Sequence, residues 1–141
     1  MLEAKQMAQK LISRFRTNDP YKIADSLDYI VIFVPLRGIR GFHQYIQRNH
    51  IIYIDNSLDE VQQRWVCAHE LGHIFLHPHL NRMFMANHTY SVQSRYEAEA
   101  DRFAACLCYL ELLEEFEGYS SAQIAEVLHL PLSLIEYAMK E

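Results

Sequence analysis

The 141-residue sequence lacks the features that mark several large classes of protein. Its cysteines, Cys67, Cys106 and Cys108, are odd in number and do not have the spacing of a disulfide framework, so we expect reduced thiols. Apolar runs such as residues 29–36 are far too short to cross a bilayer. The first residues do not include the basic cap and apolar stretch of a secretory signal. We therefore expect a cytoplasmic protein that does not bind membranes.

Positive charge is scarce as well: 13 lysines and arginines stand against 18 aspartates and glutamates, for a formal net charge of −5. This balance argues against a broad phosphate-binding surface, and direct binding of nucleic acid is not expected. Half of the residues are apolar, which excludes a disordered or fibrous chain. The length suits a single domain over residues 1–141, divided into N-terminal helices and a sheet (1–56), metal-binding helices (57–117) and a C-terminal helical pair (118–141).

The N-terminal part is expected to form two helices followed by a small sheet. Apolar residues at helical spacing predict a first helix from Leu2 to about Phe15, and Asp19 with Pro20 predicts the start of a second. Three runs rich in β-branched and aromatic residues then predict the strands of a small antiparallel sheet: residues 29–34, 41–46 and 50–54.

The stretch from His69 to His73 reads HELGH, which has the spacing of a zinc-hydrolase signature. In a helix, two histidines four residues apart lie on one face, and their ring nitrogens reach a single ion. Glu70 is placed to take a proton from water bound to that ion. A catalytic zinc has three protein ligands, so a third ligand must come from elsewhere in the chain.

The signature is expected to lie on a central helix, because residues 65–76 are apolar on nearly all sides. Residues 57–60 form a capping box that predicts the start of this helix, and Pro78 predicts its end. A loop over residues 78–93 and a second long helix, from about Ser94 to Glu117, are expected to follow.

The last 22 residues, 120–141, have a helix–turn–helix outline, with two short apolar-faced helices separated at Pro131. Acidic residues outnumber basic ones in this pair, whereas a helix–turn–helix that binds the DNA major groove needs an excess of basic residues. We therefore expect the pair to serve in packing or partner recognition and not in DNA binding.

Three residues compete for the third metal position. His77 continues the four-residue spacing, but adjacent turns of one straight helix do not surround a tetrahedral ion comfortably. His79 has the position used when a glycine turn bends the chain back under the metal, and Leu76 stands where that glycine would be. Glu97 lies 24 residues after His73, on the second long helix, which is able to cross the first.

Helix geometry favours Glu97 among these. Glu97 and Asp101 are four residues apart and share the apolar face of their helix, where two carboxylates are costly unless they are paired, hydrogen-bonded or bound to metal. We predict Glu97 as the third zinc ligand and Asp101 as the acceptor of the spare N–H of a ligating histidine. Glu99 points roughly the other way and is expected to face solvent.

Other polar residues receive weaker assignments. His88 and Tyr90 lie in the loop between the two metal-bearing helices and are candidate donors to the oxyanion that forms during peptide hydrolysis. His77 is expected to cap its helix or to pack. Four further histidines are expected to be surface or partly buried residues and not ligands: His43, His50, His79 and His129.

These segments together resemble the ImmA/IrrE-type metallopeptidases. The similarity is sharpest in residues 68–77 and 97–105, in that order, and it extends to residues 17–24 and 51–55. The resemblance implies a zincin-like endopeptidase with a thermolysin-like arrangement, in which the zinc ligands are His69, His73 and Glu97 and the catalytic base is Glu70. One departure is that residues 107–111 lack the proline that family members often have there.

The resemblance also implies a role. Family members are typically cytoplasmic, are often encoded by phages and integrative elements, and cleave, or promote cleavage of, a helix–turn–helix repressor. We therefore expect an α+β protein that is a Zn2+-dependent endopeptidase, with such a repressor as substrate and partner. The alternative is a regulatory protein that binds a repressor or DNA without cutting it and whose zinc serves structure only.

Overall fold

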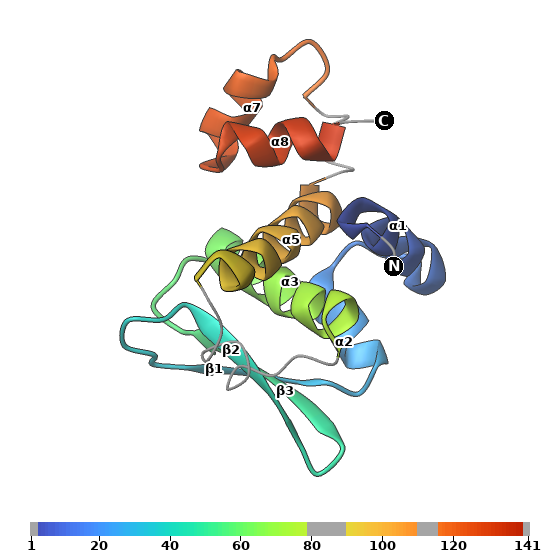
Figure 1. Cartoon of the computed structure of the whole chain (residues 1–141), viewed down its shortest axis with the longest axis vertical. Helices are drawn as coiled ribbons and strands as arrows, with labels where there is room; N and C mark the ends of the chain where they lie inside the picture. Colours follow the sequence, from blue (N-terminus) through green and yellow to red (C-terminus); the bar gives the residue numbers. More distant parts are fainter. Residues whose placement is uncertain (1–2, 79–89, 110–115, 140–141) are drawn as a thin grey trace.

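The computed structural model describes residues 3–78, 90–109 and 116–139. Within these residues the protein is α+β, as predicted, with six helices and one three-stranded sheet (Figure 1). The sheet lies at one end of the molecule, two short C-terminal helices lie at the other, and the longest helices lie between them. In chain order the described elements are α1 (Ala4–Phe15), α2 (Pro20–Ser26), β1 (Ile30–Val34), β2 (Gly41–Ile46), β3 (Asn49–Asp55), α3 (Glu60–Leu76), α5 (Tyr90–Tyr109), α7 (Ser121–Leu128) and α8 (Leu132–Met139).

The two N-terminal helices begin as their sequences predict. Pro20 occupies the first turn of α2, and the Asp19 side chain accepts a hydrogen bond from the Tyr21 backbone N–H at 2.9 Å. Ala8 and Leu11 bury the inner face of α1 in the main core, against α5. The N-terminal segment therefore braces the helix that carries the predicted carboxylates.

The sheet is mixed, with strand order β1-β3-β2, so the prediction of an antiparallel sheet is wrong for one of its two pairings. Strands β2 and β3 form an antiparallel hairpin, whose turn residues Gln47 and Arg48 have φ of 50° and 67°. Strand β1 lies on the other side of β3 and runs parallel to it. A parallel pair needs a connection of a dozen or more residues, and residues 35–48 provide it by forming β2 on the way.

One face of the sheet packs against α3. Ile52 and Ile54 of the central strand β3 are fully buried there. Directly opposite residues of neighbouring strands share a face, so Gly41 and His43 of β2, which pair with Ile54 and Ile52, also lie on the helix side. This alternation directs His43 toward the helix with the HELGH signature.

Helix α3 begins two residues later than its sequence suggested. Its N-cap is Asp59, whose side chain accepts from the Gln62 backbone N–H at 2.8 Å. Ser57, the expected cap, donates its hydroxyl to the Asp55 carboxylate at 2.8 Å. The capping-box prediction was therefore wrong in its first residue: Asp59 accepts the backbone N–H at the start of the helix, and Ser57 bonds to the end of β3.

Helices α3 and α5 cross closely. At Gly72 a Cβ atom would lie 3.0 Å from Phe103 Cδ1, which is tighter than an ordinary contact, so glycine suits this close approach of the two helices. Helix α3 is central and buried, as predicted. Helix α5 begins at Tyr90, four residues earlier than expected, and residues 116–118 form a turn, so the prediction that this helix reaches Glu117 is wrong there.

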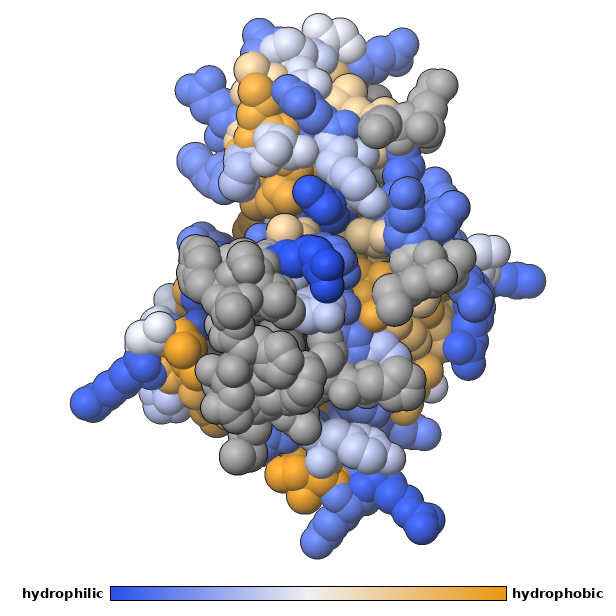
Figure 2. Space-filling model, in the orientation of Figure 1, coloured by the Kyte–Doolittle hydropathy of each residue, from blue (hydrophilic) through white to orange (hydrophobic). Residues whose placement is uncertain are grey.

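The C-terminal pair has a small core of its own, formed by Ile124, Ala125 and Ile135. Helix α8 packs against α5 and so joins the pair to the main body. Apolar side chains remain exposed on the pair, among them Val127 at 54% and Leu132 at 42%. Figure 2 shows apolar surface at this end of the molecule. Its predicted helix–turn–helix character stays a prediction. Among the described helices, none combines the length and apolar content needed to cross a bilayer.

Candidate metal centre

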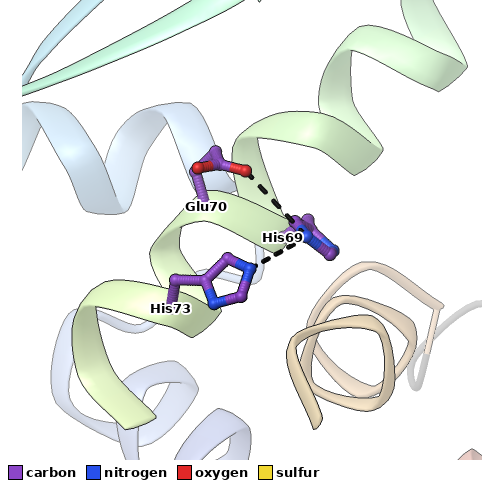
Figure 3. Close-up of side chains that lie close together, drawn as sticks. All are labelled: His69, Glu70 and His73. Atoms are coloured by element: carbon purple, nitrogen blue, oxygen red, sulfur yellow. Dashed lines mark hydrogen bonds and ion pairs between the residues drawn. The ribbon is translucent and has the colours of Figure 1, made fainter. Parts of the chain in front are cut away.

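Helix α3 presents His69, Glu70 and His73 together (Figure 3). One ligand atom from each lies within 4.8 Å of the others. The helix is packed on several sides, so these polar groups are largely enclosed: the side chains of Glu70 and His73 are 2% and 7% exposed, and that of His69 is 15% exposed. The signature therefore places its polar groups where they need partners.

Helix α5 supplies one of these partners in Glu97. Its Oε2 lies 2.8 Å from Nε2 of His69, and its Oε1 lies 3.1 Å from Nε2 of His73. The two Nε2 atoms are 3.2 Å apart. Three side chains from two helices thus meet, which is the proximity that the predicted ligand set requires. His77 and Glu70 are less well placed than Glu97 to share an ion with the two Nε2 atoms. His77 contacts the other ring nitrogen of His73, Nδ1. The nearer oxygen of Glu70 is 3.9 Å from His69 Nε2.

This donor set fits a small divalent cation. Zinc with ligands at about 2.0–2.1 Å in a tetrahedron separates its donor atoms by roughly 3.3 Å. The two Nε2 atoms are 3.2 Å apart, and each lies 2.8 or 3.1 Å from a different oxygen of Glu97, which is close to that value. Two imidazoles and one carboxylate also suit zinc chemically, and they leave part of a tetrahedral shell for water.

Asp101 holds the other nitrogen of His69. The Asp101 Oδ1 lies 2.8 Å from His69 Nδ1, so the ring donates Nδ1–H to the carboxylate and turns Nε2 toward Glu97. Asp101 is one helical turn beyond Glu97 on α5, which is the relation that the sequence predicted.

The charges in the site are strongly coupled. Burial by itself lowers the pKa of His69, but hydrogen bonds to Asp101 and Glu97 outweigh it and raise that pKa to about 9. Burial likewise raises the pKa of Glu97, but hydrogen bonds from His69 and His73 outweigh it and hold that pKa well below its usual value. A positive charge is therefore favoured where these three side chains meet.

The far side of His73 carries a second chain of hydrogen bonds. Nδ1 of His73 lies 3.2 Å from Nδ1 of His77, and Nε2 of His77 lies 2.7 Å from Glu99 Oε2. The expectation that Glu99 faces solvent is therefore wrong, because His77, which is 3% exposed, reaches across to it from the end of α3. Burial holds the pKa of His77 below its usual value, which favours the neutral ring. His77 is also the C-cap residue of α3, as expected.

His43 contacts Glu70, which was not expected. Its Nδ1 lies 2.8 Å from Glu70 Oε1, and its side chain is 18% exposed. His43 is thus partly buried, within the range that the sequence predicts, but its contact with Glu70 is new. The available signal was the strand alternation that places His43 on the same face as Gly41, but it required knowing which helix covers that face.

The remaining predicted residues divide into those that the structure describes and those that it does not. His79 and His88 lie outside the described residues, and only the backbone of Tyr90 is described, as the first residue of α5. His50 lies between the rings of Tyr29 and Tyr45, with centroid distances of 4.6 and 4.5 Å, away from the donor set.

All three cysteines are free and buried, as expected for small core residues. Burial raises the pKa of the Cys106 thiol to about 11 and that of Cys108 to about 12, so these thiols stay protonated near neutral pH. We infer no metal-binding role for them.

The chain is similar to known proteins over most of its length. A family model for peptidase M78, described as an IrrE N-terminal-like domain, matches residues 24–140. The chain is 40% identical over 101 residues to "Uncharacterized immunity region protein 2" of Bacillus phage phi105, covering 71% of this chain and 64% of that protein. It is 29% identical over 144 residues to "Metallopeptidase ImmA" of Bacillus subtilis (strain 168), covering 97% and 84% of the two chains. The chain thus spans less than two thirds of the length of the phage relative.

Proposed function

Because the chain belongs to the ImmA/IrrE family of metallopeptidases, we propose that it is a zinc-dependent endopeptidase that hydrolyses a peptide bond in a protein substrate. The observation that carries the proposal is the meeting of His69, His73 and Glu97 from two helices, with the Glu70 carboxylate beside them. We assign the first three as zinc ligands and Glu70 as the catalytic base.

The residues divide the chemical work. His69, His73 and Glu97 would hold a divalent cation, which would act as a Lewis acid, acidifying water and polarising a peptide carbonyl. Glu70 accepts the proton of the attacking water as its oxygen bonds to the carbonyl carbon. Glu70 then returns this proton to the amine nitrogen as the C–N bond breaks. Asp101 keeps Nε2 of His69 turned into the site by accepting the Nδ1 proton.

The oxyanion that forms during hydrolysis needs a hydrogen-bond donor. We keep His88 and Tyr90 as candidates, since both precede the helix that carries Glu97 or lie at its start. A tyrosine-to-phenylalanine variant of residue 90 with unchanged kcat would remove Tyr90 from this role.

The substrate that we propose is a helix–turn–helix transcriptional repressor, whose cleavage relieves repression. This follows from the family resemblance, and it agrees with the relative that is named as a protein of a phage immunity region. The net charge of −5 argues further against DNA as the direct target.

The proposal is tested with purified protein, Zn2+ and the repressor encoded by the neighbouring gene. We expect discrete repressor fragments on a gel, loss of the fragments with a chelator, and no cleavage by Glu70→Gln despite normal zinc content. Glu126→Gln, a change of an exposed glutamate on α7, is the matched control and should cleave normally. A fully active Glu70→Gln protein would exclude the assigned base.

The same experiment separates the enzyme from a regulator that binds without cutting. A regulator would form a stable complex and leave the repressor intact, with or without zinc. Zinc content and complex formation are therefore measured on the same samples as cleavage.

A further inference from the structure

We propose that His43 is a positioning residue, which holds the Glu70 carboxylate in the orientation for proton transfer. The inference rests on the peptidase function proposed above, and it concerns a residue that lies on the sheet and outside the HELGH signature. Its starting point is the 2.8 Å contact between His43 Nδ1 and Glu70 Oε1, which joins strand β2 to helix α3.

The backbone arrangement builds this contact. At Gly41, where β2 begins, a Cβ atom would clash with the Val66 side chain and lie 2.7 Å from the Tyr53 carbonyl oxygen. The lack of a side chain at Gly41 therefore lets β2 approach α3 closely. Two strand residues advance about 6.6 Å. Four helix residues advance about 6 Å. The next pair along the two elements is therefore His43 with Glu70.

The backbone register and one ring neighbour agree with this placement. His43 pairs with Ile52 of the central strand in the backbone register, and the Ile52 side chain is fully buried. The His43 ring is inclined by 27° to that of His73, with a centroid distance of 6.1 Å. The strand thus places His43 on the helix side of the sheet, and its ring faces the signature helix.

The contact gives the two oxygens of Glu70 different neighbours. Oε1 faces His43, whereas Oε2 lies 3.9 Å from Nε2 of His69. A carboxylate in its basic form only accepts hydrogen bonds, so His43 must donate through Nδ1–H. A buried carboxylate whose first oxygen is held in this way presents its second oxygen in one orientation, and the orientation of a base strongly affects the rate of proton transfer.

Two variants of His43 test whether its Nδ1 atom is the one that matters. In His43→Asn the side-chain amide nitrogen lies near the former Nδ1 position, whereas in His43→Gln it lies near the former Nε2 position. We expect His43→Gln to lower kcat for repressor cleavage by about 10- to 100-fold, with zinc content unchanged and KM within about threefold. His43→Asn should keep at least about ten times the kcat of His43→Gln. Gln44→Ala, on the opposite face of the same strand, is the control.

Three kinetic results would overturn the inference. One is equal kcat in the Asn and Gln variants, and another is a kcat of wild-type size in His43→Gln. The third is a loss of kcat that parallels a loss of bound zinc, since that would make His43 a support for the metal site. An active Glu70→Gln protein would instead defeat the proposed function itself, whatever the His43 variants do.

A measurement on the metal-free protein does not depend on activity or on the folding of a variant. Long-range 1H–15N correlation spectra of protein labelled with 15N-histidine report which ring nitrogen carries hydrogen. We expect hydrogen on Nδ1 of His43. A neutral His43 ring with hydrogen on Nε2 alone has nothing to donate to Glu70, and it would overturn the inference.

Discussion

The two helices that form the metal centre hold their side chains in different ways. On α3 the side chains of Glu70, His73 and His69 are 2%, 7% and 15% exposed, and the helix is enclosed by the core. On α5 the side chains of Glu97 and Asp101 are 45% and 40% exposed. The histidines are thus positioned by packing, whereas the carboxylates reach in from the surface and are held by hydrogen bonds to the histidines.

This difference predicts where a substitution acts. A change on the α3 side leaves a cavity or an unsatisfied polar group in the core, so it alters folding as well as metal binding. A change in an α5 carboxylate lets water replace the lost group, so it alters metal binding with little effect on folding.

Replacing a ligand from each helix should give the largest effect. Glu97→Gln should weaken zinc binding by more than about 100-fold and leave the unfolding free energy of the metal-free protein within about 1 kcal/mol. His73→Ala should abolish zinc binding and also destabilise the metal-free protein by about 1–3 kcal/mol, since it leaves a cavity and Nδ1 of His77 loses its partner. Competition with a chromophoric chelator and thermal unfolding measure the two quantities. Wild-type zinc affinity in Glu97→Gln would remove it from the ligand set.

Substitutions of the carboxylates that orient the ligand histidines should weaken zinc binding less, and by different amounts for His69 and His73. Asp101→Asn should weaken zinc binding by about 10- to 100-fold, since it removes the acceptor that contacts His69 directly. Glu99→Gln should weaken it by about tenfold or less, because Glu99 acts on His73 only through His77. The same chelator competition decides between them. A larger effect in Glu99→Gln would mean that the His77 chain, and not Asp101, dominates the orientation of the site.

The pH should change metal binding and metal-free stability in opposite directions. The pKa of His69 is raised from 6.5 to about 9 on folding, so its contribution to stability is complete below about pH 6.5 and is lost as the pH rises through 9. The pKa of Glu97 is lowered from 4.5, so its contribution is present above about pH 4.5 and is lost as the pH falls below that. The contributions of His69 and Glu97 to the stability of the metal-free protein are therefore both present between about pH 4.5 and 6.5.

Zinc has to displace the proton of His69, so its affinity should rise by up to about tenfold per pH unit between pH 6.5 and 9. Zinc titrations at several pH values, paired with thermal unfolding of the metal-free protein, test both trends. A zinc affinity that stays constant over this range would contradict the raised pKa of His69.

The local sequence was sufficient to predict which side chains lie together when they belong to the same helix. The four-residue spacing of His69 and His73 follows from helix geometry, and so does the shared face of Glu97 and Asp101. Burial of α3 followed from its apolar circumference. The structure brings all four side chains together, while their binding of zinc remains a proposal.

Contacts between elements distant in sequence were not predictable in the same way. The parallel pairing of β1 depends on where the chain crosses the sheet, and strand propensity does not encode this. The contact of His43 with Glu70 depends on the close approach at Gly41, and that of Glu99 with His77 depends on how α5 crosses α3. Each needs the relative placement of two elements, which a single sequence does not show.

The smallest expected effect tests the crossing itself. Alanine at position 72 has a higher helix propensity than glycine by about 1 kcal/mol, which would stabilise α3. Its Cβ would also lie 3.0 Å from Phe103 Cδ1 and 3.2 Å from Phe103 Cβ, in a fully buried contact where overpacking costs about 1–3 kcal/mol. The cost of overpacking should exceed the gain in helix propensity, so we expect Gly72→Ala to lower the unfolding free energy by about 1 kcal/mol. It should also weaken zinc binding about fivefold, because α5 moves away from α3 and takes Glu97 with it.

Phe103→Leu in the same background removes the ring atoms that meet the new methyl group and should recover part of the lost zinc affinity. A Gly72→Ala protein that is more stable and binds zinc normally would mean that the two helices separate without moving the carboxylates, and that α5 reaches the site by side-chain length alone.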